Sequence, residues 1–165
     1  MTQSCRSEEL KKAKEYALLL LKFRPRSVGE IKEKLKRRGL GECVISAVVE
    51  DFKRRGLLDD AVFAKAWVRD RMSLKPQGRL KLKMELKAKG VEPAYIDEAL
   101  EEASETDEYE IARNLAKRRA WHSGRMDKPT LERRLLGFLR RRGFSYDIVN
   151  KVVKEVTKSE SRHNS

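Results

Sequence analysis

Leu35-Lys36-Arg37-Arg38-Gly39-Leu40 is the first of three related stretches along this chain. The second is Leu86-Lys87-Ala88-Lys89-Gly90-Val91, and the third is Leu139-Arg140-Arg141-Arg142-Gly143-Phe144. Each predicts the basic last turn of a helix, a glycine in the left-handed conformation, and an apolar residue that packs back onto the helix. Because the glycines recur about every 50 residues, we predict a chain built from repeats.

The sequence after each glycine also repeats. Apolar side chains follow at the fifth, sixth, ninth and tenth positions, a spacing that places them on one face of a helix. Each glycine therefore separates two helices. The apolar residues are Val44, Ile45, Val48 and Val49 in the first copy, Tyr95, Ile96, Ala99 and Leu100 in the second, and Ile148, Val149, Val152 and Val153 in the third.

A further helix precedes each pair, with Ala17, Ala64 or Ala112 on its inward face; in the first repeat it is predicted over Leu10–Phe23. We expect an all-α fold of three tandem three-helix repeats. A unit of this size cannot bury enough apolar surface alone, so we expect the repeats to stack into an elongated, curved array. The predicted boundaries are a flexible N-terminus at 1–9, repeats at 10–57, 58–106 and 107–157, and a flexible tail at 158–165.

Two short motifs predict helix starts. Ser27-Val28-Gly29-Glu30 has the form of a capping box, in which the serine and the glutamate each bind a free backbone amide of the other residue. The paired Asp59 and Asp60 can be catalytic or metal-binding, but at a helix start such a pair more often caps the helix and complements its dipole. We therefore interpret these aspartates as an N-terminal cap.

The composition indicates a polyanionic partner. Hydrophobic and charged residues each make up 39% of the chain, and the net charge is +13 with a pI near 9.9. These values favour nucleic acid or a nucleoprotein over an anionic membrane. The longest apolar run, Tyr16–Leu21, is too short to span a bilayer, and the polar first residues do not resemble a secretory signal, so we expect a cytoplasmic protein.

The sequence predicts no catalytic site. Cys5, Cys43, His122 and His163 match no zinc spacing, and there is neither a P-loop nor a glycine-rich dinucleotide turn. No nucleophile or orienting carboxylate has a fixed relation to His122. We expect a protein that is not an enzyme and uses no cofactor and no metal. We expect a monomer, and no heptad pattern is long enough to indicate a coiled coil.

The second helix of every repeat is its cationic element. If the repeats stack in register, these helices can form a positive stripe that follows a phosphate backbone. The alternative interpretation is that lysine and arginine only occupy solvated faces and helix C-termini, where they are favourable. The candidate contact residues are Arg26, Lys36, Arg37, Arg38, Arg79, Lys83, Lys87, Lys89, Arg133, Arg134, Arg140, Arg141 and Arg142.

The two tryptophans are further candidates, because an indole can stack on a nucleic-acid base. Trp67 has the spacing of a core residue and is interpreted as structural. Trp121 lies beside His122 and Ser123 at a predicted helix end, where both a structural and a binding role stay open.

The order and spacing of these motifs resemble the RecX family of bacterial recombination regulators. The resemblance covers about residues 13–156 and is looser in the third repeat. It also includes Arg26-Ser27, Leu57-Leu58 and the stop signals at Gly39 and Gly90. Its most specific part is Gly56, Asp59, Asp60, Phe63 and Ala64, followed by Gly78, Leu86 and Gly90.

The resemblance implies three tandem three-helix repeats in a curved, elongated molecule. It also implies binding to the RecA recombinase, in the groove of the filament that RecA forms on single-stranded DNA. There the protein would suppress the ATPase, coprotease and strand-exchange activities of RecA, by blocking filament growth or by promoting disassembly. Binding to free single-stranded DNA, and more weakly to double-stranded DNA, is then expected to depend on salt.

Two other functions are compatible with the residues. Helix, glycine turn and helix resemble a helix-turn-helix, so the chain can be a direct, non-specific DNA-binding protein without a recombinase partner. Against this hypothesis, Glu42 and Cys43 are poor readers of bases at the start of a recognition helix, as are Glu92, Pro93 and Ala94. The third hypothesis is a helical scaffold for an acidic protein, which predicts no role for DNA.

Overall fold

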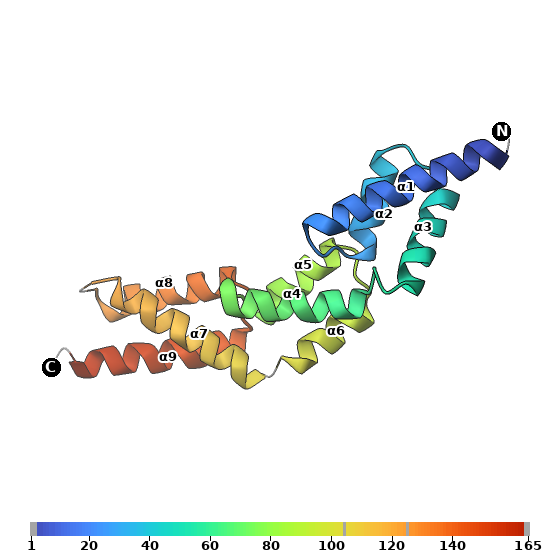
Figure 1. Ribbon diagram of the computed structural model, residues 1–165. Coiled ribbons are helices and arrows are strands. Elements are labelled where there is room, and N and C mark those ends of the chain that lie inside the picture. Colours follow the sequence, from blue (N-terminus) through green and yellow to red (C-terminus); the bar gives the residue numbers. More distant parts are fainter. Residues whose placement is uncertain (1–2, 104, 125, 164–165) are drawn as a thin grey trace. The chain divides into compact units, whose positions relative to one another are not determined.

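The structure of the protein is a computed structural model that describes residues 3–103, 105–124 and 126–163. The described residues form nine helices and no strand, which confirms the predicted all-α class (Figure 1). In chain order the helices are α1 (Gln3–Phe23), α2 (Val28–Arg37), α3 (Glu42–Arg54), α4 (Asp60–Leu74), α5 (Arg79–Ala88), α6 (Pro93–Glu102), α7 (Glu105–Trp121), α8 (Lys128–Arg141) and α9 (Tyr146–His163).

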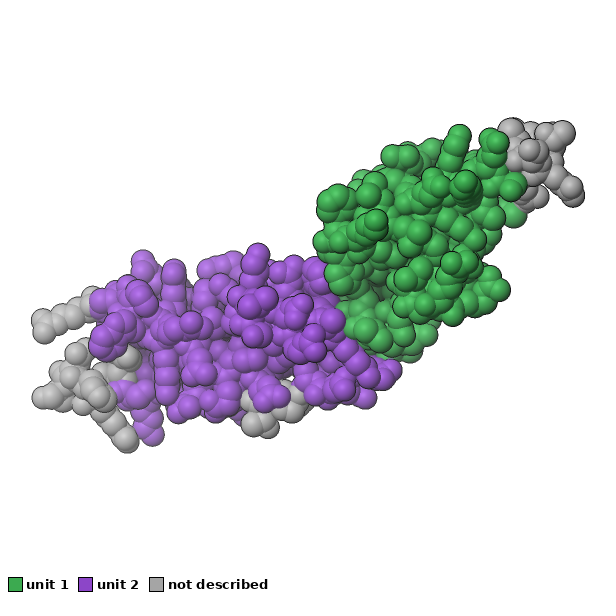
Figure 2. Space-filling model, viewed as in Figure 1, with its two compact units in different colours: residues 1–64, 86–96 green, residues 65–85, 97–165 purple. Residues whose placement is uncertain are grey.

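The chain folds into two compact units, which Figure 2 shows in different colours. Unit 1 consists of Met1–Ala64 and Leu86–Ile96, and unit 2 consists of Lys65–Glu85 and Asp97–Ser165. Helices α4, α5 and α6 each contribute residues to both units, because the unit boundaries fall within them. Each unit has its own apolar core.

The core of unit 1 lies between α1, α2 and α3. Ala17 of α1 is fully buried, and its small side chain leaves room for the larger residues of the two neighbouring helices. The apolar residues that α3 buries are the four predicted from their spacing, together with Phe52. The buried members of this core are Ala13, Ala17, Val28, Ile31, Leu35, Val44, Ile45, Val48, Val49, Phe52 and Leu58.

The core of unit 2 includes an apolar cluster between α7, α8 and α9. As in unit 1, the first helix supplies small residues, here Ala112 and Ala116, while α8 and α9 supply branched side chains. The buried members of this cluster are Ala112, Leu115, Ala116, Ala120, Leu131, Leu135, Leu139, Phe144, Val149, Val152, Val153 and Val156.

The three basic stretches end helices as predicted. Gly39, Gly90 and Gly143 have φ values of 81°, 73° and 82°, in the left-handed region that favours glycine. Each glycine amide donates to the carbonyl three residues earlier, and the next amide donates to the carbonyl five residues earlier. This pair of bonds is a Schellman motif, and the apolar residues that follow, Val91 and Phe144 among them, pack back onto the helix.

Three details differ from the sequence-based expectations. Tyr95 is 37% exposed, whereas the spacing predicts it on the inward face of its helix; a tyrosine in the first turn of α6 can keep its hydroxyl hydrated. Helix α1 begins at Gln3 and not at Leu10, and α9 continues to His163. The added turns are polar, and glutamate and lysine favour a helix without any burial. The flexibility of the two ends stays a prediction.

Candidate cationic interface

The end of α2 carries a group of exposed basic side chains. Lys36, Arg37 and Arg38 are all exposed, because the buried side of this turn is occupied by Leu35. Arg37 forms an ion pair with Glu33 one turn earlier, and the guanidinium of Arg38 lies 3.8 Å from the centre of the Tyr16 ring. An exposed ion pair of this kind contributes little to stability, so Arg37 is available to an anionic partner.

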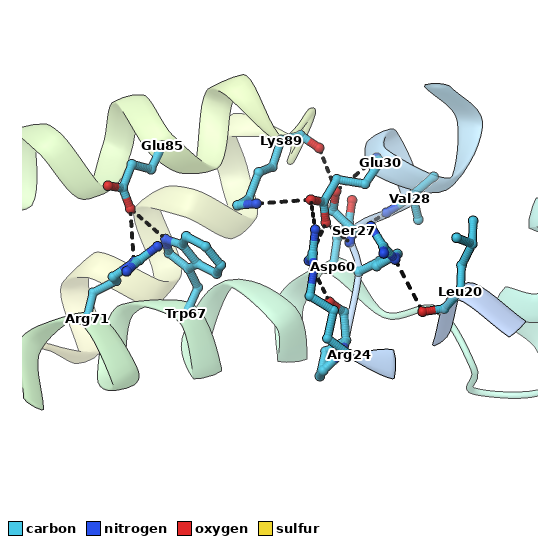
Figure 3. A network of polar contacts seen from close by, with 12 residues as sticks. Leu20, Arg24, Ser27, Val28, Glu30, Asp60, Trp67, Arg71, Glu85 and Lys89 are labelled. Carbon is cyan, nitrogen blue, oxygen red and sulfur yellow. Dashed lines mark hydrogen bonds and ion pairs between the residues drawn. The ribbon is translucent and has the colours of Figure 1, made fainter. Parts of the chain in front are cut away.

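In unit 1 the start of α2 meets the end of α5, and we call this contact the first joint. The Ser27 hydroxyl donates to the Lys89 carbonyl at 2.5 Å, and the Lys89 ammonium binds Glu30 Oε1 at 3.0 Å (Figure 3). A Cβ built on Gly29 would lie 2.5 Å from the Lys89 carbonyl oxygen and 2.8 Å from Cα of Gly90. Glycine is therefore required on both sides of the first joint.

Glu30 is the centre of the polar network at the first joint (Figure 3). Its carboxylate accepts bonds from Arg24 at 2.7 and 3.2 Å, from Lys89, and from the Ser27 amide at 3.2 Å. The last contact completes the predicted capping box, which is confirmed. Burial raises the pKa of Glu30, but the bonds from Arg24, Lys89 and Ser27 together outweigh burial and lower the pKa to about 2.

Unit 2 contains an equivalent contact, the second joint, between the start of α5 and the end of α8. The Gly78 amide donates to the Arg142 carbonyl at 2.8 Å, and the Leu80 amide donates to the Gly143 carbonyl at 3.1 Å. The Arg142 side chain donates to the Pro76 carbonyl at 2.9 Å. A Cβ built on Gly78 would overlap the backbone of Gly143. The basic end of α8 is thus held against the start of α5, the cationic helix of the preceding repeat.

A carboxylate from the following repeat completes the start of α2 and of α5. Asp60 Oδ1 accepts the amide of Val28, the first residue of α2, at 2.8 Å. Glu108 Oε1 accepts the amide of Arg79, the first residue of α5, at 2.9 Å. Both carboxylates are buried, and burial raises the pKa of Asp60 although the Val28 amide lowers it. We call these two contacts the carboxylate clamps.

The carboxylate clamps correct one part of the sequence interpretation. Asp59 is the predicted cap of its own helix, since Oδ1 accepts the Val62 amide at 3.0 Å. Asp60 binds the start of α2 instead, and its partner lies 32 residues earlier in the chain. Local sequence rules identify a cap within four residues, so they could not have found Asp60 or Glu108 in this role.

The structure separates the candidate contact residues into two groups. The first group is partly buried and binds acceptors within the chain; it consists of Arg26, Arg79, Lys89 and Arg142. Arg26 Nε donates to the Leu20 carbonyl at 3.2 Å, and the Arg79 side chain donates to the Ala103 carbonyl at 3.4 Å. The others have exposed side chains, although Lys83 pairs with Asp97 at 2.8 Å. The exposed group is Lys36, Arg37, Arg38, Lys83, Lys87, Arg133, Arg134, Arg140 and Arg141.

Trp67 is a structural residue, as its spacing predicts. The indole is partly buried in unit 2 and donates from Nε1 to Glu85 Oε2 at 3.0 Å (Figure 3). Arg71 binds the same carboxylate oxygen at 3.3 Å and lies 4.4 Å from the centre of the ring. The Trp67 ring is therefore held from two sides.

Among the described residues, no three histidine, cysteine or acidic side chains converge in a way that could hold a metal ion. Within the same residues, no helix has the length and apolar character needed to cross a membrane. The features that remain are the exposed cations of the second helices and the joints between repeats. Tandem three-helix repeats with these features define a helical-repeat protein.

Comparison with known families identifies this class further. The chain matches the RecX first three-helix domain over residues 13–52, the second over residues 59–100 and the third over residues 105–153. Together these matches cover most of the sequence. The chain therefore belongs to the RecX family of regulatory proteins.

Individual relatives agree with this assignment. The chain is 36% identical over 148 residues to the regulatory protein RecX of Amycolatopsis mediterranei, and this alignment covers 90% of this chain and 85% of the relative. It is 33% identical over 166 residues to the regulatory protein RecX of Streptomyces coelicolor, and this alignment covers 96% of this chain and 88% of the relative. The crystal structure of RecX from Lactobacillus salivarius superposes with a TM-score of 0.83 at 24% identity, over 91% of this chain and 97% of that chain, and supports the fold.

Proposed function

We propose that this protein regulates homologous recombination and DNA repair by binding the filament of RecA on single-stranded DNA. Binding inhibits the ATPase, coprotease and strand-exchange activities of RecA. The protein acts as a cytoplasmic monomer, without catalysis of its own and without a cofactor. The observation that carries the proposal is that a chain matched by all three RecX domains exposes basic residues on the second helix of each repeat.

The joints give this proposal a physical basis. In unit 1 the basic end of α5 meets the start of α2, and in unit 2 the basic end of α8 meets the start of α5. At each joint the basic last turn of one second helix therefore lies against the start of the second helix of the neighbouring repeat. A nucleoprotein filament presents phosphates at regular intervals, and exposed cations on several helices can neutralise several of these phosphates at once. Arg140, Arg141, Lys36 and Arg37 are our primary candidates for these contacts.

The steady-state ATPase of the cognate RecA, assembled beforehand on single-stranded DNA, tests the proposal. The protein is titrated into the filament at two salt concentrations. We expect inhibition well below one protein per RecA subunit, and weaker inhibition at the higher salt because screening reduces the attraction between exposed charges. An unchanged ATPase rate, together with salt-sensitive binding to bare DNA, would favour the direct DNA-binding function.

A further inference from the structure

The first helix of every repeat ends on a large apolar residue that points into solvent. Helix α1 ends at Phe23, α4 at Leu74 and α7 at Trp121. Their exposed fractions are 77%, 78% and 82%, the highest among the described large hydrophobic side chains. A single exposed apolar side chain is common on protein surfaces, so the surroundings of each must decide whether it suits a ligand. Of the three, only Trp121 carries an indole.

Hydrogen bonds close the end of α7 and leave the Trp121 side chain exposed. Nδ1 of His122 lies 2.6 Å from the Arg118 carbonyl oxygen, and the Ser123 hydroxyl donates to the Arg119 carbonyl at 2.7 Å. Gly124 then reverses the chain with a φ of 64°. Because these contacts satisfy the last carbonyls of α7, the backbone under the indole is fixed while the indole itself stays outside the core.

The surroundings of Trp121 are strongly basic. Residues 117–134 contain seven lysines and arginines and two acidic residues. Both acids are engaged locally: Asp127 Oδ2 accepts the Thr130 amide at 3.0 Å, and Glu132 Oε1 accepts the Thr157 hydroxyl at 3.2 Å. The described basic side chains of this segment are all exposed, and they are Lys117, Arg118, Arg119, Lys128, Arg133 and Arg134.

We propose that Trp121, with Arg118, Arg119 and Lys128, forms a subsite for single-stranded DNA in which the indole stacks on an unpaired base. The cations bind the flanking phosphates. In a duplex the bases are already stacked, so the indole adds nothing there and only the phosphate contacts remain. The subsite deepens the proposed function, because it names a contact between this chain and the DNA of the filament.

Intrinsic fluorescence tests stacking directly. The chain has two tryptophans, so the difference between the wild-type protein and Trp121→Phe isolates the signal of Trp121. We expect an oligo(dT) strand to quench the wild-type emission, and to leave the emission of Trp121→Phe nearly unchanged. Oligonucleotide binding without quenching in the wild-type protein would overturn the proposal.

Affinity measurements at fixed salt provide a second test with a matched control. Trp121→Ala should weaken binding to oligo(dT) by about tenfold, while Trp121→Phe keeps most of the affinity because a phenyl ring also stacks. Binding to duplex DNA, and the slope of affinity against salt concentration, should stay unchanged because the phosphate contacts remain. The control is Leu74→Ala, which removes an equally exposed side chain without a π face.

If Trp121→Ala lost equal affinity for single-stranded and duplex DNA, the result would contradict the subsite. An equal loss of affinity for oligo(dT) in Leu74→Ala would also contradict it. Weaker filament inhibition in Trp121→Ala with unaltered DNA binding would place Trp121 against protein and also overturn the proposal. The ATPase titration with wild-type protein is independent of these outcomes. Inhibition by the wild-type protein without fluorescence quenching would therefore reject the subsite and retain the proposed function.

Discussion

Two separate constraints require glycine at Gly143, a positive φ and a close approach of another backbone, and only the positive φ applies at Gly39. Both glycines end a basic helix with a positive φ. No atom lies within 4 Å of a Cβ built on Gly39, whereas a Cβ built on Gly143 would overlap the backbone of Lys81 at the second joint. The repeated glycine therefore has a different structural role in the first repeat than in the third.

We predict that Gly143→Ala costs more stability than Gly39→Ala. In Gly39→Ala only the left-handed backbone is strained, at about 1 kcal/mol. Gly143→Ala adds the overlap with Lys81, which forces the joint apart and costs about 1–3 kcal/mol more. Urea unfolding of both variants, followed by circular dichroism, measures the difference. Equal losses would show that the close approach at the second joint has no energetic weight.

The pKa of Glu30 predicts a dependence of stability on pH. Because the pKa in the folded state is lowered to about 2 from an ordinary 4.5, ionised Glu30 stabilises the fold above about pH 4.5. This contribution is lost as the pH falls through about 2. We expect Glu30→Gln to be less stable than the wild-type protein by roughly 1–3 kcal/mol at pH 7, and the difference to shrink towards pH 3.

Urea unfolding at pH 7 and at pH 3 checks this prediction, with Glu33→Gln on the same helix as the control. Glu33 is 60% exposed in its ion pair with Arg37, so its loss should change the free energy of unfolding by less than about 0.5 kcal/mol at either pH. A difference between Glu30→Gln and the wild-type protein that is the same at both pH values would contradict the role of the charge.

At the level of helices, the C-terminal turn of α8 combines a contact at the second joint with exposed cations that we propose for recognition. In α8, Arg142 binds the Pro76 carbonyl and supports the second joint, while Arg140 and Arg141 are exposed. Three consecutive arginines therefore have two different roles. A charge reversal of all three would mix a loss of folding with a loss of binding.

We predict that the double variant Arg140→Glu/Arg141→Glu weakens filament inhibition by about tenfold or more, because two attractive contacts become repulsive. The far-UV circular dichroism should stay unchanged, since Arg142 is kept. Lys11→Glu/Lys12→Glu is the matched control, with the same change of charge on exposed positions of α1. Inhibition that is unaltered in the first variant, or equally reduced in the control, would remove the end of α8 from the binding surface.

Helix ends could be predicted from the sequence, whereas the contacts between repeats could not. The stop at Gly39 and the capping box at Ser27 depend on neighbours within a few residues. The bond between Ser27 and Lys89 joins residues 62 positions apart, and no periodicity encodes it. Gly78 belongs to the motif that resembles the RecX family, but only the backbone of Gly143 beside it explains why the position requires glycine.

The candidate contact residues were predictable only as a class. Charge patterning places cations on the second helices, and the structure confirms that many of them are exposed. Patterning could not show that Lys89 and Arg142 bind acceptors across a joint, since Glu30 and Pro76 are distant in sequence. The exposure of Trp121 also required the structure, because a helix-end tryptophan can equally fold back onto the core.

For the whole molecule, the elongated and curved array stays a prediction of the repeat pattern, and small-angle X-ray scattering tests it. A compact protein of 165 residues has a radius of gyration of about 15 Å. We expect a clearly larger value, because stacked repeats contact only their neighbours. A radius near that of a compact globule would contradict the array.

Through the carboxylate clamps, the second helix of each of the first two repeats depends on a residue of the repeat that follows it. The start of α2 relies on Asp60 of the second repeat, and the start of α5 relies on Glu108 of the third. Helix α8 is instead capped by its own neighbour Asp127. During synthesis the Val28 and Arg79 amides therefore gain their carboxylate acceptors only when the following repeat has emerged. Loss of the first repeat would take away the partners of Lys89 at the first joint, whereas loss of the third would take away both the second joint and the carboxylate that binds the start of α5.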